Sequence, residues 1–354
     1  MKNIIKSLIV MFTSISLFGV ANAGEVTVSG TAKASYNIAS GDVHQGKGLG
    51  VTNELNVTAS GELDNGYTWS YSTEIDPTDA QDNGVSTNDD TQLTLSTPYG
   101  TFGVFVSEGA LDLEDAASQS VMSRPTDSGD PSTTSDNYTI DGYNNLQYHT
   151  PADLLPFGIT AKVAYAPDLD DTINSGDATG QTHTKADDYE GRSMTSYQVK
   201  AAPIDGLAIG VSYNEFDDAG DNATEQAPES GAYYATYAFG NFTVGYSRAY
   251  KAMLLDDDEH QTTTNADYYD QTNKSIAMAV NDELSISYEV EESTKNAVGA
   301  ATADITQKST AVQLAYNMGG MTVGVSRASH DNNAYSTAAS AQTDQTLINV
   351  TMAF

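Results

Sequence analysis

Carboxylates are the most numerous charged groups in this sequence, and the segment Ser107–Tyr143 opens with four of them, Glu108, Asp112, Glu114 and Asp115. The segment has about 35 residues, whereas most connections have about four to six. Its second part, Ser123–Asp136, is rich in Ser, Thr, Asp and Pro and has one basic residue, Arg124. A loop this long is either disordered or functional. Because dense carboxylates attract cations, the four acids are candidate site residues.

Four further acidic runs offer oxygen ligands to hard cations such as Ca²⁺. None has the ligand spacing of a known calcium loop. We therefore interpret the runs as solvated charge, with Ca²⁺ at these acidic loops as the alternative and no other cofactor expected. The runs are Asp168–Asp171, Asp187–Glu190, Asp217–Glu225 and Asp256–Glu259.

The histidines show no metal-binding or catalytic spacing. His149 shares strand parity with Gln147, and the other four lie in expected loops, at His44, His183, His260 and His330. No two are spaced as metal ligands. A Ser–His–Asp triad can be drawn in any Ser-rich chain, so its presence is weak evidence for catalysis. We expect no enzyme, and a barrel hydrolase is the rival class.

Charge and composition exclude several classes. The chain has 15 Lys+Arg against 48 Asp+Glu, a net charge of −33, which excludes nucleic-acid binding. It has no cysteine, so disulfides and thiolate metal sites are excluded. Met1–Ala23 has the basic start, apolar run and Ala21-Asn22-Ala23 end of a cleaved signal peptide. No later run is long enough for a membrane helix, so a membrane-spanning chain would have to form a closed barrel from Gly24–Phe354.

From Gly24 onward, apolar residues occupy every second position. Val26, Val28 and Ala32 alternate with Thr27 and Ser29, and this period of two predicts a strand with one apolar and one polar face. Tight-turn signals follow, of which Asp64-Asn65-Gly66 is the strongest.

Short turns and long polar connections alternate along the chain. We count sixteen strands in eight hairpins joined by seven long loops, with a Gly-rich connection at Ser40–Gly50. Such sorting places all short turns at one end and all long loops at the other. A soluble sandwich also alternates, but its buried face is richer in Leu, Ile and Phe. The pattern predicts an all-β fold, a transmembrane antiparallel β-barrel with apolar residues facing lipid.

The chain resembles the Gram-negative general diffusion porins, most of all their α-proteobacterial branch. The resemblance rests on the signal peptide, the sixteen-strand rhythm, the turn Pro98–Gly103 with Glu108-Gly109-Ala110 after it, and the end Thr346–Phe354. It implies a homotrimer in the cell outer membrane that lets small hydrophilic solutes and cations diffuse passively, without catalysis. The final Phe354 resembles the signal read by the barrel-assembly machinery. Outer-membrane lipid and lipopolysaccharide are the other implied partners.

In this family the third extracellular loop folds into the barrel and narrows it. Ser107–Tyr143 joins the fifth and sixth expected strands, so the resemblance makes it that loop. Its acids Glu108, Asp112, Glu114 and Asp115 are then the candidates for the pore constriction, and a solvated acidic loop is the alternative. Ser123–Asp136 is interpreted as the polar return.

Strand parity sorts the charged residues between the two faces. Arg248 and Arg327 fall on the apolar face, and we interpret them as residues that snorkel outward. The places where such porins carry wall arginines, Val106–Glu108 and Glu54–Thr58, contain none. A carboxylate-rich interior favours cations, so we predict a cation-selective channel. The alternatives are a solute-specific channel and a closed adhesive or scaffold barrel. The residues predicted to face the interior are Lys33, Lys162, Lys200, Glu54, Glu62, Glu74 and Glu289.

Overall fold

The computed structural model describes residues 24–41, 46–75, 89–127, 136–167, 169, 193–217, 224–253, 255–256, 266–297, 303–338 and 341–354. The predicted signal peptide lies outside these residues. No helix in the described ranges is both long and apolar enough to cross a membrane.

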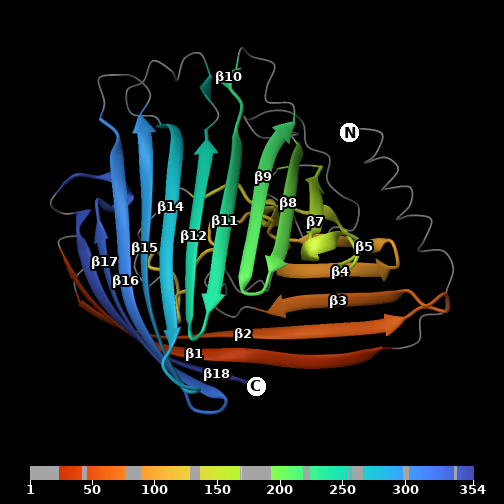
Figure 1. Ribbon diagram of the computed structural model, residues 1–354, viewed down its shortest axis with the longest axis horizontal. Helices are drawn as coiled ribbons and strands as arrows, with labels where there is room; N and C mark the ends of the chain where they lie inside the picture. The colour runs from red at the N-terminus through yellow and green to blue at the C-terminus, as the bar shows by residue number, and fades with distance from the viewer. Residues whose placement is uncertain are drawn as a thin grey trace, which may run out of the picture.

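Sixteen antiparallel strands close into one barrel (Figure 1). Each strand pairs with its neighbours in chain order, and β1 pairs with β18 to close the ring. The predicted strand number is confirmed. The strands are β1 (Glu25–Gly41), β2 (Gly46–Glu62), β3 (Thr68–Ile75), β4 (Asp89–Thr97), β5 (Gly100–Val106), β6 (Asn145–His149), β7 (Thr160–Ala166), β8 (Ser193–Ile204), β9 (Leu207–Asp217), β11 (Glu229–Phe239), β12 (Phe242–Ala252), β14 (Ala266–Ala279), β15 (Leu284–Ala297), β16 (Ile305–Asn317), β17 (Met321–Asp331) and β18 (Thr343–Ala353).

The period of two separates an exposed outer face from a covered inner face. On β15, Ile286 and Tyr288 are exposed, whereas Ser287 and Glu289 between them are buried. The same alternation runs through most strands, so apolar side chains point away from the barrel and polar ones point into it. This is the reverse of a water-soluble fold and is the arrangement expected of a barrel in lipid.

The predicted hairpin count needs a correction. Seven shorter connections occur among the described residues, and they join β2–β3, β4–β5, β6–β7, β8–β9, β11–β12, β14–β15 and β16–β17. The first and last strands close the barrel by pairing with each other, and each also pairs with its neighbour in the chain, β1 with β2 and β18 with β17. Their seam extends to Phe354, whose backbone N donates to Gly30 O at 3.0 Å. A methyl group added at Gly30 would lie 2.9 Å from the Phe354 ring, so only glycine leaves room for that ring.

Two expected loops also contain strand. The predicted Gly-rich connection Ser40–Gly50 is mostly ladder, because Ala39 pairs with Gly46 and Ile38 with Lys47. The long connections beside β11 and β12 contribute β10 (Thr224–Gln226) and β13 (Leu255–Asp256), which form a separate two-stranded sheet. Sequence periodicity missed this sheet because two or three residues are too few to show a period. Short 3₁₀ turns lie at η2 (Ile140–Gly142), η3 (Pro156–Gly158) and η4 (Asn333–Tyr335).

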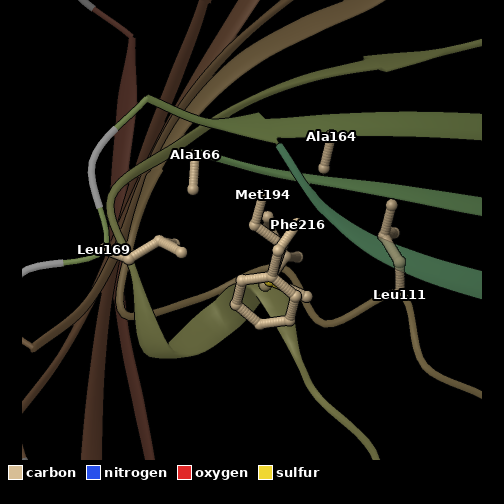
Figure 2. Packing of buried hydrophobic residues seen from close by; sticks show 7 residues of the cluster. Leu111, Ala164, Ala166, Leu169, Met194 and Phe216 are labelled. Atoms are coloured by element: carbon tan, nitrogen blue, oxygen red, sulfur yellow. The ribbon is translucent and has the colours of Figure 1, made fainter. Parts of the chain in front are cut away.

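The apolar core lies inside the barrel, where the long segment between β5 and β6 meets the wall. Figure 2 shows Leu111 of this segment near Ala164, Met194 and Phe216 of the wall. A second cluster joins Leu113 and Ala117 to the inner sides of β11 and β12. Leu111 and Leu113 are 0% and 3% exposed. These apolar contacts hold the segment against the wall.

Candidate functional site

Three glycines on the inner face form the seat of the long segment. A methyl group added at Gly245 of β12 would overlap the Ala117 carbonyl oxygen, and one added at Gly324 of β17 would lie 2.8 Å from Met122 Sδ. At Gly210 of β9 it would lie 3.1 Å from Leu113 Cδ1. Each glycine therefore lets the loop approach the wall more closely than any side chain would allow.

Polar side chains of the wall hold the loop at this seat. Glu289, which is fully buried, accepts hydrogen bonds from Ser118 Oγ at 2.7 Å and Ser120 Oγ at 2.8 Å. Further along, Met122 N donates to Gln313 Oε1 at 3.0 Å. Ser275 Oγ donates to Ala117 O at 2.6 Å. The contacts run from β12 to β16, so a wide arc of wall fixes the loop.

Arg124 is the central charge of the loop. Its guanidinium pairs with Asp115, with Asp127 Oδ2 at 2.9 Å, and with Glu291 Oε1 of β15 at 3.7 Å. Glu291 also accepts a hydrogen bond from Thr126 N at 3.0 Å. Burial lowers the pKa of Arg124, but the three carboxylates outweigh it and raise that pKa. The residue predicted to lie in a polar return therefore links the loop to the wall.

The four predicted constriction acids have different surroundings. Glu114 is 5% exposed, its Oε1 accepts from Asn137 N at 3.1 Å, and its Oε2 has no hydrogen-bond partner among the described residues. Asp115 forms an ion pair with Arg124, and Asp112 Oδ1 accepts a hydrogen bond from Thr139 Oγ1 at 2.7 Å. Glu108 is partly exposed.

Burial is the main influence on three of these carboxyls, and it raises the pKa of Asp115 to about 8 against the opposing effect of Arg124. It raises the pKa of Glu114 well above the ordinary value, and the nearby Asp112 and Asp115 raise it further. Burial also raises the pKa of Asp112, against the hydrogen bond from Thr139. A cavity of about 20 Å³ between Glu114 and Glu291 has room for one water.

The predicted wall residues divide into two groups on the inner face. Lys162 and Lys200, on β7 and β8, interact with each other electrostatically, and Lys200 also interacts with Asp112 of the loop. The second group lies on β1–β3, away from this arc: Lys33, Glu54, Glu62 and Glu74. The structure thus brings Asp112 to the lysines of β7–β8 rather than to Lys33.

The two outward arginines are placed as predicted. Arg248 and Arg327 are 52% and 53% exposed, and they pair with Asp270 and Asp344 on neighbouring strands. No cluster of three or more His, Cys, Asp or Glu in the described ranges is arranged to hold a metal ion. The four acidic runs considered for Ca²⁺ lie largely outside those ranges.

Sequence reasoning missed most of the seat. Gly210, Gly245 and Gly324 look like ordinary strand glycines in a single sequence. Met194 and Phe216 break the polar pattern of the inner face, and that break was the available signal. Apolar residues on both faces of a barrel strand indicate that something covers the inner one.

A model of the Gram-negative porin family matches residues 12–270. A search of curated sequences gives no significant match. Among solved structures, the anion-selective porin from Comamonas acidovorans has 14% identity and a TM-score of 0.67, covering 94% of this chain and 100% of that one. A trimer form of OmpT of Vibrio cholerae has 13% identity and a TM-score of 0.61, covering 94% and 100%.

A porin mutant of Rh. blastica has 16% identity and a TM-score of 0.56, and covers 93% of this chain and 100% of that one. At these identities the neighbours show the fold alone. The family model spans most of the chain, and the closed barrel with an apolar outer face agrees with it. The chain belongs to the Gram-negative porins and forms a diffusion channel in the outer membrane.

Proposed function

We propose that the channel admits small hydrophilic solutes and ions by size and charge, and that the loop from Glu108 to Asp127 narrows it. The observation that carries this proposal is the set of hydrogen bonds from the loop to Ser275, Glu289 and Gln313 on the inner wall. A loop held there occupies part of the interior. Glu108, Asp112, Glu114 and Asp115 remain the proposed constriction acids.

The proposed charge preference is for cations. The chain has a net charge of −33, and the strand register puts Glu54, Glu62 and Glu74 on the same side of the sheet as the buried Asn349. Lys33, Lys162 and Lys200 oppose them. Because Arg124 neutralises Asp115, Asp112 is the loop acid best placed to act on passing ions. The solved neighbour from Comamonas acidovorans is described as anion-selective, and its 14% identity transfers no selectivity.

The reversal potential in a KCl gradient across a planar bilayer tests this preference. We expect a clearly cation-selective value for the native chain. Asp112→Asn should move the reversal potential toward zero, because the substitution leaves Lys200 without its acidic neighbour. Asp153→Asn, in the exposed turn between β6 and β7, is the matched control and should leave it unchanged. An anion-selective native channel would refute the proposal.

Liposome swelling with sugars of graded size separates the alternatives. Rates that fall smoothly with size support a general channel. Saturable uptake of one class of sugar would indicate a solute-specific channel, and no swelling would indicate a closed adhesive or scaffold barrel. Removal of Ca²⁺ with a chelator before the same assay tests whether the acidic loops need that ion.

The remaining proposals concern export and assembly. Met1–Ala23 is proposed as the signal peptide, and Phe354, which is 69% exposed beside the β1–β18 seam, as the signal for the barrel-assembly machinery. A homotrimer is proposed because the OmpT neighbour is described in a trimer form. Cross-linking in native membranes tests it.

A further inference from the structure

The outward side chains of β12–β17 form horizontal rows, because each pairs with its neighbour across the ladder. The row nearer the short turns is apolar throughout. It runs through Phe242, Met278, Ile286, Leu314 and Val325.

The next row, two residues closer to the long connections, has three apolar members and one charged one. It contains Ile276, Tyr288, Val312 and then Arg327. Together the two rows line an apolar hollow of about 640 Å³ on the outer wall. The hollow is therefore a groove in the lipid-facing surface, with a guanidinium at one side of its upper edge.

Two lysines lie between the hollow and the long connections. Lys274 lies one row beyond Ile276, about 7 Å along the strand. Lys308 stands two rows above Val312, beside Glu292. The Glu292 carboxylate joins the two lysines, with Oε2 at 3.4 Å from Lys274 Nζ and Oε1 at 3.2 Å from Lys308 Nζ.

These lysines keep hydrogen-bonding capacity. Their side chains are 58% and 46% exposed. An ammonium group has three N–H donors, and one shared carboxylate does not use them all. The other charges on these rows are carboxylates and paired arginines: Arg248 with Asp270, Arg327 with Asp344, and Asp331 beside Lys308.

An apolar groove that ends at donor-rich cations matches one kind of molecule. Lipid-facing cations are unfavourable in hydrocarbon and become favourable at the level of lipid phosphates. The long connections leave the same end of these strands, so this edge faces the outer leaflet. We propose that the hollow on β12–β17 binds the acyl chain of one anionic lipid, whose phosphate lies between Lys274 and Lys308 beside Arg327. The proposal rests on the placement of the barrel in the outer membrane.

Native mass spectrometry of the purified folded channel tests the site. The probes are phosphatidylglycerol and phosphatidylcholine with identical acyl chains. We expect the first phosphatidylglycerol to bind more tightly than phosphatidylcholine. The double variant Lys274→Gln/Lys308→Gln should weaken phosphatidylglycerol about 25-fold, at about fivefold for each lysine.

Two further variants separate binding from a structural role. Glu292→Gln removes the competing acceptor and should tighten phosphatidylglycerol binding, whereas loss of a structural ion pair would leave the ratio of the two lipids unchanged. Lys47→Gln, an exposed cation on β2, is the control. Equal binding of both lipids to the native channel, or an unchanged ratio in the double variant, would overturn the proposal.

A second copy of the chain is the other possible occupant of this wall. Because the chain has no cysteine, Val312→Cys provides a single thiol in the hollow. Labelling by a membrane-soluble maleimide supports lipid, and complete protection in the native assembly would show a protein contact and overturn the site. Conductance should be native in all these variants, so a channel that fails to conduct would refute the proposed function separately.

Discussion

Adding one methyl group beneath the loop is the sharpest test of the constriction. Gly245 faces the interior from β12, directly below Ala117. The added carbon of Gly245→Ala would overlap the Ala117 carbonyl oxygen and lie 2.6 Å from Ser275 Oγ. Contact between such atoms is most favourable at about 3.5 Å, so the loop backbone must move roughly 1–2 Å away from the wall.

The clashing atom is a backbone oxygen of Ala117, which cannot rotate away as the end of a flexible side chain would. Overpacking of this kind costs about 1–3 kcal/mol. The movement also stretches the 2.6 Å hydrogen bond from Ser275 Oγ to Ala117 O, which adds about 0.5–1.5 kcal/mol. Because the wall lies behind the loop, the only free direction is toward the barrel axis. The substitution should therefore narrow the passage and lower single-channel conductance.

Two other glycines make the experiment comparative. Gly48→Ala on β2 meets nothing within 4 Å and should leave conductance unchanged. Gly324→Ala meets only the flexible side chain of Met122, so its effect should be smaller than that of Gly245→Ala. All three are measured in planar bilayers after circular dichroism confirms a folded barrel. Equal conductance for folded Gly245→Ala and Gly48→Ala would show that the loop does not bound the passage.

Two further predictions concern the attachment of the loop. Glu289→Ala removes the acceptor of Ser118 and Ser120, and hydrogen bonds to a charged group contribute about 1.5–3 kcal/mol each, so amide exchange across the loop should accelerate while the strands stay protected. Unchanged protection by mass spectrometry would exclude Glu289 as an anchor. Burial raises the pKa of Glu114, so the packed loop binds that proton more tightly than a released loop. Its contribution to packing is complete below the ordinary pKa of 4.5 and is lost as pH rises through the raised value. Loop exchange should therefore quicken with rising pH in the native chain. Glu114→Gln should weaken that dependence but not abolish it, because burial also raises the pKa of Asp115, and Glu291 is buried beside it; a pH dependence as strong as that of the native chain would exclude Glu114 as a contributor.

The barrel was predictable because each strand carries its own evidence. Side chains alternate strictly along a strand, so Tyr288 and Glu289 could be assigned to opposite faces from parity alone. The seam between β1 and β18 was not predictable in the same way, because strands at the two ends of a chain show no local sign of pairing. The hairpin count was wrong because the short turns begin after β2 and end before β18, which leaves one strand at each end of the chain outside the seven short hairpins.

The loop was predictable in position and length but not in its contacts. Nothing near Arg124 in the sequence indicates Glu291, because the two meet only after the barrel closes. The same holds for Glu289 and Ser118, which lie far apart in the chain. Parity placed Glu289 in the interior, and its partners come from the tertiary structure.

The alternation within Leu111–Glu114 has a consequence for charge. Leu111 and Leu113 pack into the wall, and Glu114 is buried with them, whereas Asp112 lies beside Lys200. Arg124 then draws Asp115, Asp127 and Glu291 into one cluster, where a single guanidinium offsets part of three negative charges. The loop therefore presents much less negative charge than its composition indicates, and a raised pKa at Glu114 reduces it further. Selectivity in this channel should consequently depend on the balance between Asp112 and the lysines of β7–β8, together with the carboxylates of β2 and β3, more than on the number of acids in the loop.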